Sequence, residues 1–296
     1  MKLYKQQLNF KGLVLFLIIS LNPVFAFSQV QRDSLFLQYL VAKDEHRDVI
    51  TFLSLLQNRY ADSTQSRFEI PYWKGLSFYS LRSLDSCSYY LAKVSQSSPY
   101  YKKSLFLTGI SHSYLRRFNQ AENTLLKIFS KDDSIHLATR TFELAGIALL
   151  KRDLYRFDSL KNHFSTQYYP LQKQQSNFDS YRDIIKKQQS KSAFKAALLS
   201  AIVPGMGKLY VGGQLGQGIS TFLQNTILGL QAYEALRKDG VSSPRFIIYG
   251  GLFSVFYLGN IWGSALSVKI KRQEFNDKID EQILFDMHIP LRTIFN

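Results

Sequence analysis

The side chains able to act as bases, nucleophiles or metal ligands are few and scattered along this chain of 296 residues. No pair of histidines lies at metal-ligand spacing with a carboxylate on the same helix face. No G-x-S-x-G or H-E-x-x-H motif occurs in the sequence. The five histidines are His46, His112, His136, His163 and His288. We therefore expect no enzyme, no metal site and no cofactor.

Glycine, rather than a reactive group, marks the most unusual stretch, residues 201–218. It holds six glycines and Pro204 among apolar and aromatic residues, with Lys208 as its only charge. The segment 205–208 lacks the spacing and the preceding strand of a phosphate-binding P-loop. Dense glycine serves either backbone turns with positive φ or the close approach of two helices. The alternative is an ordinary glycine-rich loop between helices.

The charge balance is strongly basic, with 37 Lys and Arg against 22 Asp and Glu and a net charge of +15. Such an excess commonly indicates a nucleic-acid partner. Residues 1–28, however, show a basic start, an apolar segment at 12–21 and small residues at Ala26 and Ser28, as in a secretory signal peptide. An uncleaved N-terminal anchor is the alternative. We expect an exported chain that binds no nucleic acid and turns its positive charge toward anionic lipid or envelope polymers.

Apolar residues recur at helical spacing between residues 33 and 166, and short polar turns separate the segments. This region is predicted to be a helical repeat. Its expected helices form four antiparallel pairs: 33–42 with 46–60, 67–82 with 85–95, 99–116 with 119–129, and 134–152 with 156–164.

The region also repeats itself at a period of 34 residues. Gly75 corresponds to Gly109, and Cys87 corresponds to Ala121. These small residues, with Pro99 near the end of a pair, resemble the tetratricopeptide repeat, best over residues 67–130. Pro71 departs from the pattern, which usually has a large aromatic residue there. Cys87, the only cysteine, is expected to be a small core residue.

The resemblance implies stacked helix pairs with a concave surface that binds a protein or peptide partner. The residues that would face this groove are Tyr72, Leu76, Tyr79, Phe106 and Ile110. Ordinary packing between helices is the alternative for each of them.

The second half of the chain is predicted to be a polar helical linker at 167–192, a membrane domain at 193–272 and a C-terminal tail at 273–296. Residues 246–268 run for 23 residues without a charge, which is long enough to span a bilayer. Residues 215–236 are interrupted by amides and are expected to span as the partner helix. Pro204 disfavours helical geometry at Val203, so the apolar segment 193–203 is expected to stop there. It is too short to cross and is expected to lie in the interface or to re-enter.

The glycine-rich stretch and a later G-N-x-W-G-S segment together are similar to a two-helix domain of uncharacterised bacterial envelope proteins. The resemblance covers about residues 195–272 and implies location and architecture only. Lys208 departs from the pattern, which commonly has Gln there. The motif residues are Pro204, Gly205, Gly207, Tyr210, Gly212, Gly218, Gly259, Asn260, Trp262 and Gly263. We further expect Gly259 and Gly263 to form a small-residue face against the first membrane helix, with Asn260 close to its amides.

The predicted fold is thus all-α, a tetratricopeptide-like helical repeat followed by an α-helical membrane hairpin. The predicted function is a non-enzymatic scaffold of the bacterial cell envelope that binds a protein on the exported, periplasmic side. In the alternative, the hairpin forms a homo-oligomer and is the active part of a membrane-assembly or transport component. The loop between the spans carries fewer cations than the outer flanks, so the positive-inside rule favours the opposite orientation. The signal-like N-terminus is the more specific pattern, and we base the orientation on it.

Overall fold

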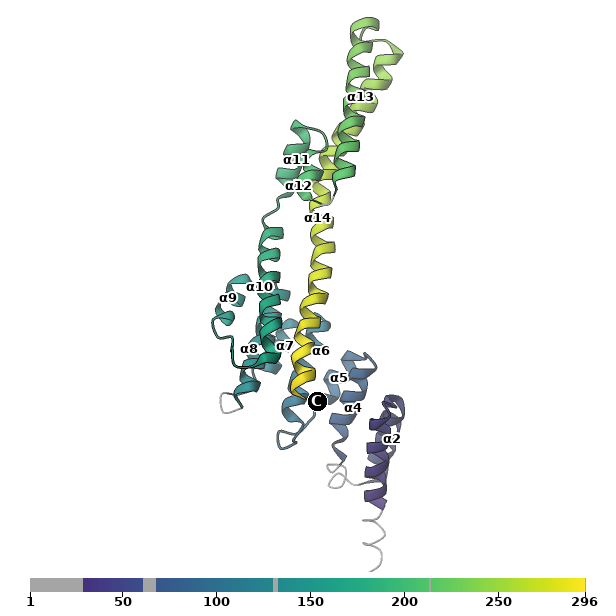
Figure 1. Cartoon of the computed structure of the whole chain (residues 1–296). Coiled ribbons are helices and arrows are strands. Elements are labelled where there is room, and N and C mark those ends of the chain that lie inside the picture. The colour runs from purple at the N-terminus through teal and green to yellow at the C-terminus, as the bar shows by residue number, and fades with distance from the viewer. Residues whose placement is uncertain (1–28, 61–67, 130–132, 213, 296) are drawn as a thin grey trace, which may run out of the picture. The chain divides into compact units, whose positions relative to one another are not determined.

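The computed structural model describes residues 29–60, 68–129, 133–212 and 214–295. Every regular element in these ranges is a helix, and the all-α class predicted from the sequence is confirmed (Figure 1). The predicted signal peptide, residues 1–28, lies outside the described ranges. Contacts divide the chain into two units, one extending to Arg140 and including Phe295, the other running from Thr141 to Ile294. Each unit is described by itself.

The first unit consists of short consecutive helices joined by tight turns. A helix over residues 29–42 precedes α2. The others are α2 (His46–Arg59), α4 (Ile70–Ser80), α5 (Leu84–Leu91), α6 (Tyr101–Tyr114), α7 (Phe118–Leu125) and the start of α8 (Ser134–Leu150). The second unit continues with the rest of α8 and with α9 (Leu154–Lys161). These bounds agree with the four predicted pairs to within a few residues at each end.

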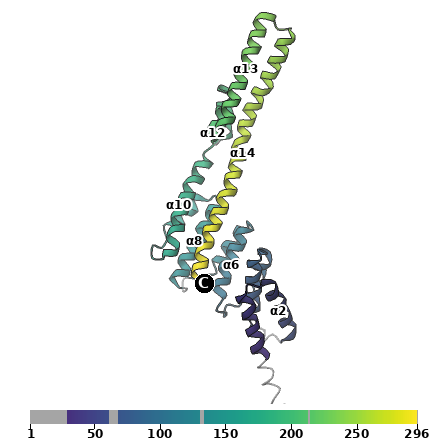
Figure 2. The ribbon, with the colours of Figure 1, turned by 45° about the vertical axis from the view of Figure 1, so that its right-hand side comes forward.

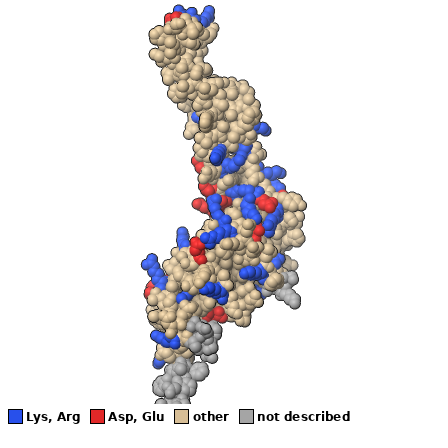
Figure 3. All heavy atoms as spheres, turned by 180° about the vertical axis from the view of Figure 1, so that it is seen from behind, with Lys and Arg blue, Asp and Glu red and all other residues tan. Residues whose placement is uncertain are grey.

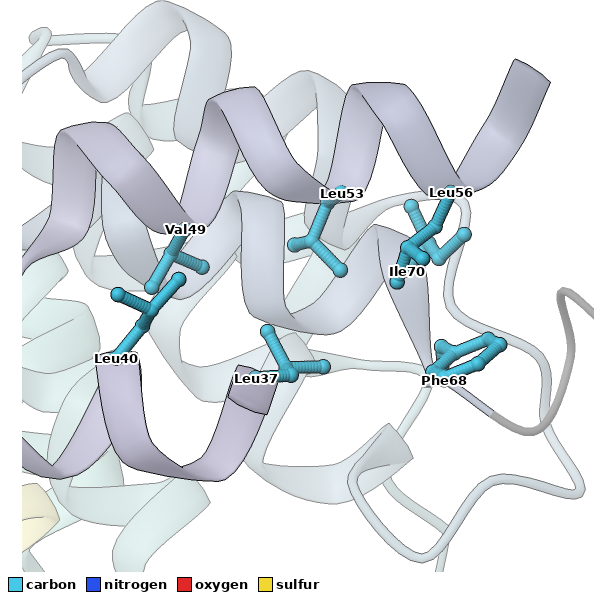
Figure 4. Packing of buried hydrophobic residues seen from close by; sticks show 7 residues of the cluster. All are labelled: Leu37, Leu40, Val49, Leu53, Leu56, Phe68 and Ile70. Carbon is cyan, nitrogen blue, oxygen red and sulfur yellow. The ribbon is translucent and has the colours of Figure 1, made fainter. Parts of the chain in front are cut away.

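The first helix pair is held together by a compact apolar cluster (Figure 4). Leu53 and Leu56 of α2 are completely buried there, and Phe68 and Ile70 from the start of the next pair close the cluster. The first pair lacks the small residues of the later pairs, and these branched side chains form its contact instead.

The turns within the helix pairs share one geometry. Arg82, Arg116 and Arg152 each adopt a left-handed backbone, with φ of 58°, 57° and 63°. After each of them, the next backbone N–H reaches back into the preceding helix; Ser83 N donates to Phe78 O at 2.9 Å and Arg117 N to His112 O at 2.8 Å. Such a bond satisfies a terminal helix carbonyl, as in a Schellman motif.

Within each of two successive pairs, a glycine allows the two helices of the pair to touch. A Cβ on Gly75 would lie 2.5 Å from Cγ of Leu91, and a Cβ on Gly109 would lie 3.0 Å from Cγ of Leu125. The two contacts are equivalent under the 34-residue period of the sequence. Cys87 and Ala121, which also correspond, are both completely buried.

The second unit is organised along a single helix of 51 residues, α14 (Pro244–Ile294). After α8 and α9 it also contains α10 (Tyr169–Gln189), α11 (Ala193–Ile202), α12 (Met206–Val211) and α13 (Leu215–Asp239). Figure 2 shows α13 beside the first part of α14 and α10 beside its second part. Helix α11 ends at Ile202, where the sequence predicted a stop, because Pro204 keeps Val203 extended.

Residues 273–294, predicted to be part of a C-terminal tail, continue α14 without a break. Ile279, Ile283 and Met287 are buried at four-residue spacing, which forms one apolar face. Met287 fills the space at Gly146 of α8, where a Cβ would lie 2.6 Å from its sulfur. The predicted tail is therefore a packed part of the second unit.

Polar contacts fix the same part of α14. Arg152 forms an ion pair with Asp280 at 2.8 Å. Asp286 accepts hydrogen bonds from the hydroxyl of Tyr181 at 2.8 Å and from the amide of Asn177 at 2.9 Å. Helix α10, predicted as a polar linker, thus supplies two side chains that position the end of α14.

Candidate functional site

The glycine-rich stretch folds into a corner where α11 and α12 meet α14. Ser200 of α11 donates a hydrogen bond from its hydroxyl to the hydroxyl of Ser264 at 2.7 Å, and both residues are completely buried. The backbone N–H of Gly207 donates to the same Ser200 oxygen at 2.9 Å. A Cβ at Gly207 would lie 2.1 Å from the carbonyl oxygen of Ala196. Only glycine fits at this crossing.

Two further motif glycines serve the turn that precedes α12. Gly205 has φ of 89°, a backbone conformation that residues other than glycine rarely adopt. A Cβ there would also lie 2.1 Å from the carbonyl oxygen of Gly218 in α13. A Cβ at Gly218 would lie 2.7 Å from a methyl carbon of Leu209. Both explanations offered for the dense glycine, turns and close helices, therefore apply within this one stretch.

Hydrogen bonds also connect the corner to the short segment between α10 and α11. The hydroxyl of Tyr210 accepts from the backbone N–H of Ser192 at 3.1 Å. The ammonium group of Lys191 donates to the carbonyl of Val211, and Arg272 donates to the carbonyl of Lys191 at 2.6 Å. Gly212, with φ of 90°, ends α12. The motif tyrosine is thus a hydrogen-bonded corner residue.

Asn260 points into this corner rather than to an amide of α13. Its side-chain N–H donates to the carbonyl of Ser200 at 3.3 Å, and the hydroxyl of Tyr257 donates to the carbonyl of Ala201. Asn225 of α13 is also buried and donates to the carbonyl of Thr221 at 2.9 Å. The expected pairing of Asn260 with an amide of the first membrane helix is absent among the described contacts.

The predicted packing of Gly259 and Gly263 against α13 is wrong. A Cβ at either position would meet nothing within 4 Å, and Trp262 between them is 76% exposed. Successive helix residues are rotated by about 100°, and α14 turns Asn260 and Ser264 inward instead. Asn260 and Ser264, not the glycines, therefore face α11.

The residues predicted to line a partner-binding groove have different environments. Tyr72, Phe106 and Ile110 are completely or almost completely buried and belong to the core of the first unit. Tyr72 stacks on Tyr100 with ring centroids 4.0 Å apart. Leu76 and Tyr79 are partly exposed. Of the five, these two offer side-chain surface to a partner, and the other three follow the alternative reading as packing residues.

The buried titratable side chains include Cys87 and Glu143. Among the described residues, no group of three or more His, Cys, Asp and Glu side chains is placed to hold a metal ion. Burial raises the pKa of the Cys87 thiol to about 11, which disfavours the nucleophilic thiolate. Burial also raises the pKa of the Glu143 carboxyl in α8 well above its ordinary value. Cys87 is the core residue that the sequence predicted.

The most distinctive surface of the second unit is apolar. Among the described residues, α14 is the helix long and apolar enough to cross a membrane, and its most apolar window is only 6% buried. Helix α13 is long enough to cross a membrane but has no segment of comparable hydropathy. Its amides and its terminal charges, Glu234, Arg237, Lys238 and Asp239, lower its hydropathy.

Charged groups bound this apolar surface at both ends. On the face seen in Figure 3, charged atoms gather at the free end of the α13–α14 hairpin and again beyond its base, and the shaft between them carries almost none. At the free end, Lys238 pairs with Glu234 at 2.8 Å, and Arg245 lies 3.5 Å from both Glu234 and Asp239.

Comparisons with protein families, curated proteins and solved structures found no match to this chain.

Proposed function

We propose that this chain is a membrane-tethered, non-enzymatic scaffold. Helix α13 and residues 244–268 of α14 form a helical hairpin in the bilayer, and the helical repeat binds a protein partner on the exported side of a bacterial envelope. The observation that carries the membrane assignment is the exposure of the most apolar window of α14, of which only 6% is buried. An apolar core helix of a soluble protein buries its surface, because exposure costs about 25 cal/mol per Å².

The dimensions of the hairpin support the same assignment. Helix α13 has 25 residues. At a rise of about 1.5 Å per residue it extends for roughly 37 Å, and a bilayer core is roughly 30 Å thick. The ion pairs at the free end place charged groups where a crossing hairpin would emerge into water. Helix α13 would enter the bilayer as the packed partner of α14, despite its lower hydropathy.

The glycine corner lies at the other end of the hairpin and would lie near the membrane interface. The hydroxyl of Ser200, the backbone N–H of Gly207 and the backbone carbonyl of Ser200 are hydrogen-bonded within the corner, as buried backbone in a low-dielectric environment requires. The basic residues of this region, including Lys195, Lys269 and Lys271, would rest on anionic headgroups. The corner would thereby fix the angle between the hairpin and α10.

Membrane extraction tests the tether. The full chain, expressed in bacteria, is expected in the membrane pellet and to stay there after alkaline carbonate washing. Recovery in the soluble fraction would overturn the proposal. Orientation is tested with Cys87→Ala protein carrying Ser242→Cys at the hairpin tip or Lys187→Cys in α10. A membrane-impermeant maleimide added to intact spheroplasts is expected to label Lys187→Cys and to leave Ser242→Cys unlabelled. The opposite pattern would place the repeat in the cytoplasm.

The partner-binding role rests on the resemblance of residues 67–130 to a known binding repeat and on the partly exposed side chains of Leu76 and Tyr79. Crosslinking in intact cells is expected to capture a defined protein with the parent chain and less of it with Leu76→Arg or Tyr79→Arg. Tyr155→Arg, at a residue that is 88% exposed, is the matched control. Equal capture by all variants would exclude this surface.

A further inference from the structure

An open apolar groove of about 740 Å³ runs along α13, and Phe256 of α14 also lines it. Gly216, Ser220 and Gln224 lie along it at four-residue spacing, and Ile219, Leu223 and Ile227 flank them. A Cβ at Gly216 would meet nothing within 4 Å. Leu223 and Ile227 are 53% and 59% exposed. This set of six residues, named the α13 face below, is a surface that another helix could approach closely.

The α13 face also carries polar groups without partners. The side chains of Gln224 and Ser220 are exposed and make no hydrogen bond to any described residue. In water this costs nothing, because solvent satisfies both groups. In hydrocarbon an unpaired amide is strongly unfavourable, and an acyl chain can neither donate nor accept a hydrogen bond. A lipid could therefore fill the groove but could not satisfy Gln224.

We propose that the α13 face pairs with the same face of a second copy of this chain, forming a dimer about a two-fold axis in the membrane. The inference rests on the proposed function, because it requires α13 to lie in the bilayer. A glutamine amide both donates and accepts, so the two Gln224 side chains can satisfy each other across such an axis. Gly216 and Ser220 remove the side-chain bulk that would hold two helices apart.

The other small-residue surface of the hairpin lacks this signal. Gly259 and Gly263 of α14 are open, but the hydroxyls near them are already satisfied. Ser267 donates to the carbonyl of Gly263 and Ser254 to that of Gly250, both at 2.8 Å. Asn260 points into the corner. The indole N–H of Trp262 is exposed there, but it only donates, so two copies of it cannot satisfy each other across a two-fold axis as two glutamine amides can.

Cysteine crosslinking in native membranes tests the dimer. In a Cys87→Ala background, Ser220→Cys is expected to form a disulfide-linked dimer on mild oxidation, and Gly259→Cys is expected to form several-fold less. Gln224→Leu, combined with Ser220→Cys, is expected to lower the dimer fraction about 3- to 20-fold, from the usual strength of a hydrogen bond between membrane helices. Ser254→Leu makes a similar polar-to-leucine change on α14 and is expected to have no effect.

The outcomes separate this inference from the proposed function. Protein that stays in the carbonate-washed pellet, but whose Ser220→Cys form crosslinks no better than Gly259→Cys, overturns the dimer alone. Crosslinks only to another protein, or a dimer fraction unchanged by Gln224→Leu, would overturn it as well. Protein recovered outside the pellet overturns the membrane assignment first.

Discussion

The hydroxyl of Ser200 donates to the hydroxyl of Ser264 at 2.7 Å while its oxygen accepts from the backbone N–H of Gly207 at 2.9 Å. One buried side chain thus joins α11, the start of α12 and α14. The arrangement needs a residue without a side chain at position 207, since a Cβ would lie 2.4 Å from the Ser200 oxygen and 2.1 Å from the carbonyl oxygen of Ala196.

Gly207→Ala is therefore expected to destabilise the second unit by at least the roughly 1–3 kcal/mol typical of overpacking, because a backbone oxygen cannot rotate away. The measurement is the thermal midpoint and protease resistance of the purified protein in detergent. Gly251→Ala, at a position where a Cβ meets nothing within 4 Å, is the control. Gly263→Leu is likewise expected to be tolerated. A midpoint for Gly207→Ala equal to that of the parent would contradict this account of the corner.

The two repeat glycines are expected to respond differently to alanine. At Gly75 the new Cβ would lie 2.5 Å from Leu91, a loss of about 1–3 kcal/mol. At Gly109 the distance to Leu125 is 3.0 Å, and the roughly 0.5–1 kcal/mol gained by replacing a helical glycine offsets much of the strain. Thermal unfolding of both variants checks the order. A larger loss for Gly109→Ala would contradict it.

Cys87 is expected to behave as a small core residue. Cys87→Ala loses only the 3.4 Å contact between its sulfur and the hydroxyl of Ser111 and should be nearly neutral, whereas Cys87→Leu should cost about 1–3 kcal/mol by overpacking. Because burial raises the pKa of the thiol to about 11, a maleimide at pH 8 should label the native protein slowly and the urea-unfolded protein rapidly. Rapid labelling of the native protein would refute the assignment.

Glu143 is expected to make stability depend on pH. Its carboxyl oxygens are buried without a hydrogen-bond partner among the described residues, and burial raises its pKa well above the ordinary value. The folded state therefore holds a proton that the unfolded state releases near pH 4.3. The contribution of the neutral carboxyl to stability is complete below that pH, declines by about 1.4 kcal/mol per pH unit above it and stops declining beyond the folded pKa.

Glu143→Gln removes this dependence, because the amide is neutral at every pH. The variant is expected to unfold at a higher temperature than the parent at pH 8 and to differ much less near pH 4. Glu281→Gln, at an exposed position of α14, is the control. Parallel curves of thermal midpoint against pH for parent and Glu143→Gln would rule out a buried neutral carboxyl.

The end of α14 is expected to be essential to the second unit. Met287→Ala removes the side chain that fills the space at Gly146 and should cost about 2–5 kcal/mol. Phe285→Ala, two residues earlier but 64% exposed, should cost far less. The comparison uses thermal unfolding in detergent. Equal thermal midpoints for the two variants would show that residues 273–294 are not packed against the rest of the unit.

The sequence by itself determined the helical class, the extent of most helices and the stop at Ile202. These features follow from local causes. The helical spacing of apolar residues identifies the helices and their buried faces. Pro204 disfavours helical geometry at the residue before it and so ends α11. The 34-residue period identifies equivalent positions such as Gly75 and Gly109. The same period predicted the burial of Cys87, because Cys87 corresponds to Ala121, a small residue at the same position of the next helix pair.

Only the tertiary structure decided which face of α14 turns inward. Between residues 246 and 268 the helix is apolar or small on every side, so periodicity provides no contrast by which to choose between Gly259 and Ser264. In the folded protein Asn260 and Ser264 face inward, because the hydroxyl of Ser200 and the backbone of α11 form hydrogen bonds with them. In α13 the fold buries Asn225 and leaves Gln224 exposed, a division between adjacent amides that depends on where α14 lies.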